Sequence, residues 1–184
     1  MKRSACLLLL IPLMACGMTK QQEVVDPQLG YRAVFPVTVY VYPGTSKEIQ
    51  KSDAWRPTRT TESTPFGQIE WFTRISNFAG RSSQYFTVEV GTLPPGNQGG
   101  ANLQEILATL KQWNSARFSG PTVELEGDRG PGFEYYHKKE KSGEIVNGII
   151  VFRRGRIHHA RASSDNPNDA QLANFLRNFR VDPD

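Results

Sequence analysis

The alternation of apolar and polar side chains predicts a chain rich in β-strands. In residues 84–91, Phe86, Val88 and Val90 alternate with less apolar residues, which is the period of a strand that buries one face. Comparable strand patterns occur at residues 31–42, 68–75, 122–127, 133–139, 144–152 and 156–162. Pro36 indicates a break or an edge strand within the first of these segments.

Two segments have helical periodicity instead. The first follows Asn102, a candidate N-cap, and has one apolar stripe made of Leu103, Ile106, Leu107, Leu110 and Trp113. The second opens with Asn166-Pro167-Asn168-Asp169, an N-cap with proline at the first helical position. Its expected inward residues are Leu172, Ala173, Phe175, Leu176 and Phe179.

The segment 144–152 determines the expected architecture because it is apolar on both sides. Val146 and Ile150 face one way, whereas Ile149 and Val151 face the other. A strand of this kind is covered on both faces. With two amphipathic helices available, we expect an α+β fold, a mainly antiparallel β-sheet with helices on both faces. Polar, Pro- and Gly-containing stretches at 43–66 and 93–100 are expected to be long loops.

The first residues have the pattern of an export signal. Lys2 and Arg3 precede an apolar run at 5–15, which is well short of the roughly 20 residues that a membrane-spanning helix needs. The run ends in Leu13-Met14-Ala15-Cys16, which resembles the bacterial lipobox. That resemblance implies cleavage before Cys16 and lipidation of its sulfur, while an ordinary secretory signal cut near Ala15 is the alternative.

We therefore divide the chain into a signal peptide at 1–15, a lipidated cysteine with a flexible tether at 16–30, and one globular α/β domain at 31–184. The lipid bilayer would be a partner through acylated Cys16. A single acyl chain binds a membrane only marginally, but the two or three chains of a lipoprotein would anchor the domain stably. Gly17 follows the cysteine, a pattern that resembles outer-membrane sorting. The expected location is the bacterial envelope, on the outer membrane and facing the periplasm.

Charge and cysteine content narrow the function further. Removing Lys2 and Arg3 reduces the formal net charge from +4 to +2, which gives no reason to expect nucleic acid as a partner. Cys6 would leave with the signal peptide and Cys16 would be lipidated. The domain would then hold no disulfide, no cysteine metal site and no cysteine nucleophile.

The order of elements resembles the PsbP/Mog1-like α/β/α sandwich proteins. The resemblance lies in Phe35-Pro36, in Gly-Pro-Gly-Phe-Glu-Tyr at 130–135, in the hairpin at 148–160, and in the terminal helix ending at 175–181. It implies a sandwich fold and an accessory or binding role. It provides no catalytic residues to carry over, because function depends on sites rather than folds.

The three histidines do not predict a metal site. His158 and His159 are adjacent on a strand and therefore point to opposite faces. If tight turns at Ser142-Gly143 and Arg154-Gly155 set the register, His137 lies level with Gly148. His137 and His159 are then roughly 12 Å apart, too far to share an ion. We expect no metal and no cofactor.

The same register gathers Tyr135, His137, His159 and Arg161 on one face, with Gly148 leaving space between His137 and Arg161. Our hypothesis is a small polar ligand pocket there, suited to an anion. The ordinary alternative is that these groups line the solvent-exposed end of a sheet face or lie under a helix.

Three functions remain open. The first is a binding or accessory module that engages an envelope protein or a small ligand. The second is a periplasmic enzyme, hydrolase-like, with His137 or His159 as base. The third is a structural envelope protein. We favour the first because no nucleophile motif accompanies the histidines.

Overall fold

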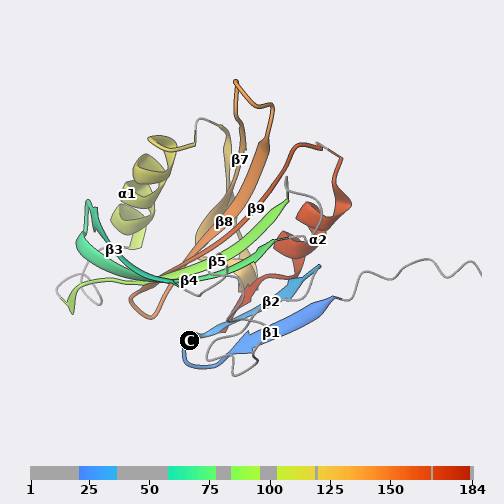
Figure 1. Cartoon of the computed structure of the whole chain (residues 1–184). Helices are drawn as coiled ribbons and strands as arrows, with labels where there is room; N and C mark the ends of the chain where they lie inside the picture. Colours follow the sequence, from blue (N-terminus) through green and yellow to red (C-terminus); the bar gives the residue numbers. More distant parts are fainter. Residues whose placement is uncertain are drawn as a thin grey trace, which may run out of the picture.

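The computed structural model describes residues 21–36, 58–77, 84–95, 103–118, 120–166 and 168–182. In these residues the chain is mainly antiparallel β-structure with two α-helices, so the expected α+β class is confirmed (Figure 1). None of the described helices is long and apolar enough to cross a membrane.

The strands of the described ranges form two sheets. The large, seven-stranded sheet has the order β3 (Thr58–Thr64), β4 (Gly67–Asn77), β5 (Tyr85–Thr92), β9 (Arg156–Ser164), β8 (Ile145–Arg153), β7 (Gly132–Lys138) and β6 (Thr122–Leu125). The small sheet has the order β1 (Gln22–Asp26), β2 (Tyr31–Phe35) and β10 (Arg180–Val181). Every pairing is antiparallel, since hairpins connect most neighbours.

Strand β8 is buried on both sides, as its sequence predicts. Ile149 and Val151 belong to one hydrophobic cluster, whereas Val146 and Ile150 belong to another on the opposite face. Helix α1 (Leu103–Ser115) packs against the second cluster. Helix α2 (Ala170–Asn178) and the small sheet pack against the first (Figure 1).

The cluster under α2 is centred on aromatic rings. Phe175 lies with its ring centroid 5.0 Å from that of Phe35 and 5.3 Å from that of Phe86. Helix α2 therefore joins the small sheet to the large one. Its N-cap is Asp169, whose carboxylate accepts from the backbone N–H of Gln171 at 3.0 Å. The expected start at Asn166 is thus three residues early, and Ala173 is exposed rather than inward.

Helix α1 confirms part of its predicted stripe. Ile106 and Leu110 are buried, but Leu103 is 40 % exposed, so the stripe begins one turn later than expected. Trp113 is half-buried and stacks on Trp71 of β4, with centroids 5.7 Å apart. The candidate cap Asn102 lies outside the described residues.

Two segments expected to be irregular are strands. Strand β1 lies within the predicted tether 16–30, where its pairing with β2 runs from Gln22 opposite Phe35 to Asp26 opposite Tyr31. Strand β3 lies within the predicted loop 43–66 and forms one edge of the large sheet. Both predictions were wrong for the same reason. These short, mainly polar strands form because a neighbouring strand supplies hydrogen bonds, which local hydrophobic patterning does not show.

The position of β1 generates a stability prediction with a matched control. Val24 is 4 % exposed and packs in the cluster under α2, whereas its neighbour Val25 is 51 % exposed. Val24→Ala should lower the free energy of unfolding by about 1–2 kcal/mol, because it removes buried methyl groups. Val25→Ala should change it by less than about 0.5 kcal/mol. Urea denaturation measures both, and equal small effects would show that residues 22–26 behave as a tether.

Candidate functional site

The structure changes the register on which the predicted pocket depends. Gly148 lies opposite Arg161 as expected, but it pairs with Tyr135 rather than His137. The two-residue shift arises at the β7–β8 turn, which closes by a bond from the Lys139 N–H to the Glu144 carbonyl at 2.8 Å. Gly143 follows with a φ of +70°, a conformation that glycine adopts readily. The turn is therefore centred one residue earlier than Ser142-Gly143.

A chain of hydrogen bonds replaces the expected pocket. The Tyr135 hydroxyl lies 2.8 Å from His159 Nε2, and His159 Nδ1 lies 3.1 Å from a Glu89 carboxylate oxygen. Arg161 Nη2 lies 3.9 Å from the other oxygen of Glu89. In the tautomer that satisfies both contacts, the tyrosine donates to Nε2 and Nδ1–H donates to Glu89. We call Tyr135, His159, Glu89 and Arg161 the polar network.

The side chain of Tyr135 fills the space that Gly148 was expected to leave open. A Cβ added to Gly148 would lie 2.3 Å from atoms of the Tyr135 ring. Only glycine at position 148 therefore lets the Tyr135 ring pass over this strand. Phe118 stacks on Tyr135 with centroids 4.9 Å apart. His137 meets the edge of Phe118 at 5.7 Å. The predicted void between His137 and Arg161 is therefore occupied, while Tyr135, His159 and Arg161 do come together.

Burial sets the protonation state of the polar network. His159 is 3 % exposed, and burial lowers its pKa although Glu89 opposes the shift. Burial also raises the pKa of the Tyr135 hydroxyl. For Glu89, burial by itself would raise the pKa, but the hydrogen bond from His159 and the charge of Arg161 hold it below its usual value. At neutral pH the network is a neutral tyrosine, a neutral imidazole and a carboxylate.

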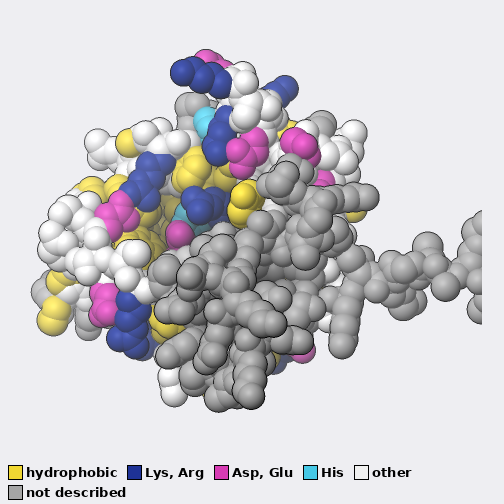
Figure 2. Space-filling view, in the orientation of Figure 1, with side chains coloured by type: hydrophobic (Ala, Val, Ile, Leu, Met, Phe, Trp, Pro, Cys, Tyr) yellow, Lys and Arg dark blue, Asp and Glu magenta, His cyan; other side chains and the backbone are white. Residues whose placement is uncertain are grey.

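Glu89 was missing from the sequence-predicted site. It lies on β5, directly opposite His159 on β9, and the two residues are far apart in sequence. Alternation along residues 84–91 put Glu89 on the face away from Val88 and Val90, which was correct. Only the β5–β9 pairing could have connected it to His159. Figure 2 shows the face between α1 and strands β7 and β8, where acidic, basic and histidine side chains gather around hydrophobic ones.

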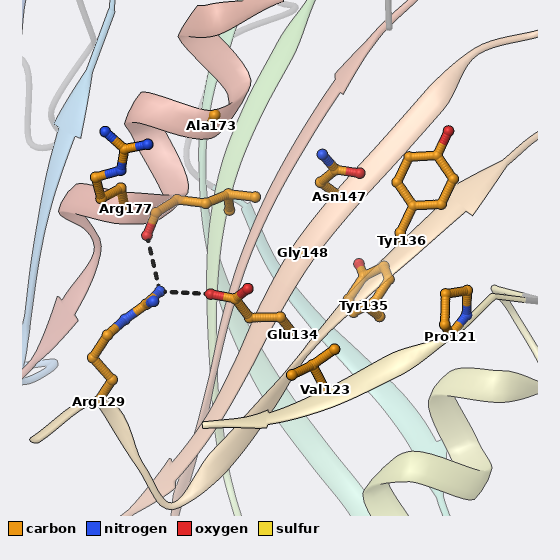
Figure 3. Close-up of a pocket in the computed structure, with 11 residues that line it drawn as sticks. Pro121, Val123, Arg129, Glu134, Tyr135, Tyr136, Asn147, Gly148, Ala173 and Arg177 are labelled. Atoms are coloured by element: carbon orange, nitrogen blue, oxygen red, sulfur yellow. Dashed lines mark hydrogen bonds and ion pairs between the residues drawn. The ribbon is translucent and has the colours of Figure 1, made fainter. Parts of the chain in front are cut away.

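The opposite face of the large sheet contains an open cleft with a volume of about 400 Å³. It lies between α2 and the β6–β7 edge, and Figure 3 shows Tyr136 and Asn147 on neighbouring strands along its floor. Arg129 crosses one end, with its guanidinium 2.8 Å from the Glu134 carboxylate and 3.4 Å from the Leu176 carbonyl. Because side chains alternate along β7, this cleft and the polar network use successive residues of one strand.

The cleft has the mixed lining of a binding site. Val123 is 65 % exposed and Tyr136 is 42 % exposed, so apolar surface is open to solvent there. The Asn147 side-chain oxygen is buried without a hydrogen-bond partner among the described residues. Arg177 of α2 also lines the cleft, and within the described part of the chain it has no carboxylate partner. The volume falls within the range of small-ligand sites, which combine apolar walls with a few polar groups.

His158 lies on the other side of β9 from His159, as alternation predicts. Its Nε2 is 2.8 Å from the Leu29 carbonyl, and burial lowers its pKa to about 4. Across the described ranges, no group of three or more His, Cys, Asp or Glu side chains is arranged to hold a metal ion.

No family model, no curated protein and no solved structure matches this chain. What the polar network and the cleft can do must therefore be inferred from their own geometry and chemistry.

The buried histidines predict loss of stability in mild acid. An unfolded histidine binds a proton near pH 6.5, whereas folded His158 does so only near pH 4. The contribution of neutral His158 to the free energy of unfolding is therefore complete above pH 6.5. It decreases by roughly 3 kcal/mol as the pH falls to 4. Glu89 adds to the loss only below its ordinary value of 4.5. Denaturation as a function of pH measures this slope.

His158→Gln keeps an N–H donor for Leu29 but cannot titrate, so its stability should vary much less across this range. His159→Gln should reduce the pH dependence of stability further, since burial lowers the pKa of that histidine too. A wild-type slope that survives in both variants would show that other groups cause the acid sensitivity.

Proposed function

We propose that this chain is a bacterial envelope lipoprotein, anchored through Cys16 and sorted to the outer membrane as Gly17 suggests, whose folded domain binds a ligand or partner segment in the cleft beside α2. Support for the anchor comes from the order of Lys2-Arg3, the apolar run and Leu13-Met14-Ala15-Cys16. Acylated Cys16 would join the bilayer from the periplasmic face of the outer membrane. An envelope protein is the expected partner, and nucleic acid is not.

The finer fold assignment is also a proposal. A helix lies against each face of the large sheet, which agrees with the PsbP/Mog1-like sandwich that the order of elements resembles. Members of that group act as accessory or binding proteins, a role that the cleft suits. The predicted loops at 43–66 and 93–100 would be natural contact surfaces on such a scaffold, but residues 43–57 and 96–100 of them lie outside the described residues.

The observation that carries the binding function is the cleft of about 400 Å³. Its exposed Tyr136 can stack on a flat or apolar group, while Asn147 and Arg177 supply an amide and a cation. Arg129 is already paired with Glu134, so the charge left at the cleft is positive. These features suit a polar ligand or an extended peptide segment that carries a negative group.

A hydrolase is the second candidate, favoured by one specific observation. Tyr135, His159 and Glu89 touch in the order of a nucleophile, a base and an orienting carboxylate. The burial of Tyr135 and the raised pKa of its hydroxyl argue against attack on a substrate. The network serves better as a neutral brace between β5, β9 and β7. A structural envelope role remains the third alternative.

The anchor is tested with two cysteine variants. Cys16→Ser should move the protein from the membrane fraction to the soluble fraction and abolish labelling by a fatty-acid analogue, because the acylated sulfur is lost. Cys6→Ser is the matched control, since that residue lies in the signal peptide and should leave both properties unchanged. Retention of lipid label in Cys16→Ser would rule out this anchor.

The cleft is tested by site-specific photo-crosslinking in envelopes. A photoreactive residue at Val123, on the cleft rim, should give a defined adduct, whereas one at Val25 on the small sheet should not. Both valines are exposed, so accessibility is matched. Arg177→Glu should reduce the Val123 adduct several-fold, because it reverses the cleft's unpaired charge. Identical adducts at both positions, or none at Val123, would contradict binding at the cleft.

A further inference from the structure

A second cavity, of about 260 Å³, has a set of lining residues that shares none with the cleft. It is enclosed by the β1–β2 turn at residues 27–30, the β8–β9 hairpin at residues 153–156, and Asp182 near the end of the described chain. His158 forms part of its wall. Three arginines of this one hairpin, Arg153, Arg154 and Arg156, therefore line the same small cavity.

Arg153 contributes a fixed positive charge to this cavity. Its guanidinium makes five hydrogen bonds to backbone carbonyls, to Gly130 at 3.1 and 2.5 Å, Asp128 at 2.9 Å, Val181 at 3.2 Å and Asp182 at 3.1 Å. Since a guanidinium has five N–H donors, no donor remains for a ligand. The partners are neutral carbonyls, so the charge itself is not cancelled.

Arg156 is the residue that can grip a ligand. One of its N–H groups donates to the Gln28 carbonyl at 2.6 Å, which holds the side chain against the β1–β2 turn. Its other N–H groups have no partner among the described residues. A guanidinium held in place with donors to spare matches the geometry of carboxylate or phosphate oxygens.

The electrostatic balance of the cavity is positive. Arg153, Arg154 and Arg156 line it together with one carboxylate, Asp182, while His158 is neutral at pH 7. In the part of the chain that the structure describes, no carboxylate lies within ion-pair distance of Arg153 or Arg156. The charges of Arg156 and Arg153 add to burial in lowering the pKa of His158, which is the effect expected of a positive field.

The hairpin tip also has an unusual backbone. Arg154 has a φ of +51° and Gly155 a φ of +68°, the pair of positive angles found in tight two-residue hairpin turns. Asparagine or glycine is the usual residue at the first position. Residues held in such conformations are concentrated at functional sites. An arginine here adds charge at an energetic cost to the turn.

We propose that this cavity binds a small anion with phosphate or carboxylate oxygens, gripped by Arg156 in the field of Arg153. The source is soluble rather than a lipid headgroup. The cavity lies at the turn end of the β1–β2 hairpin, about 13 Å along β1 from Gln22, the end that leads towards Cys16. This choice of source rests on the proposed anchor, whereas the anion site does not.

The test is isothermal titration of the full chain in mild detergent with inorganic phosphate and pyrophosphate at constant ionic strength. Saturable one-to-one binding with a dissociation constant of about 1 mM or lower is expected. Arg156→Gln should weaken it about tenfold or more, because a charge-assisted pair is lost. Arg59→Gln, at the β3 edge, is the matched control for charge and should change it by less than about twofold.

Two further measurements keep the outcome clear. Arg156→Lys retains the charge without the fork and should bind with intermediate affinity, which tests the site even if Arg156→Gln folds poorly. Vesicles of phosphatidylcholine with and without phosphatidic acid test the source. Arg156-dependent sedimentation with the acidic vesicles would support the anion site but overturn the soluble source. Absence of saturable binding, or equal weakening in Arg156→Gln and Arg59→Gln, would overturn the proposal.

Discussion

The two-sided burial of β8 is the constraint on which the rest of the structure depends. A strand with apolar side chains on both faces is stable only if both faces are covered. Helix α1 covers one face, and α2 together with the small sheet covers the other. The sheet extends beyond these covers at its β6–β7 edge. The cleft lies there, between one side of α2 and the exposed face of β6 and β7.

Strand β7 separates the two chemical environments. Its odd-numbered Tyr135 enters a buried network with His159 and Glu89, while the neighbouring Glu134 and Tyr136 face the cleft. In this network the Glu89 carboxylate and the Arg161 guanidinium have opposite charges, and the tyrosine and the imidazole that support the sheet from inside are neutral. The cleft is open, partly apolar and positive. A difference of one residue along the strand therefore separates a bracing role from a binding role.

The small sheet is held in place by arginine side chains as well as by apolar packing. Arg153 binds carbonyls from the β6–β7 connection and from Val181 and Asp182, and Arg156 binds the β1–β2 turn. The small sheet is thus attached to the large one by arginines as well as by the aromatic cluster around Phe175. Carbonyl partners leave the charges of Arg153 and Arg156 uncancelled, so the same contacts that fasten the small sheet create the positive cavity.

Local patterning by itself determined the α+β class, both helices, the burial of β8 on two sides and the opposite directions of His158 and His159. These features repeat within one element, so periodicity reveals them. The tertiary structure alone decided that 22–26 is a strand, that Tyr135 rather than His137 lies opposite Gly148, and that Glu89 joins His159. Each of these depends on a turn or on the pairing of distant strands. Such contacts are made by the folded sheet as a whole, and no short stretch of sequence contains both partners.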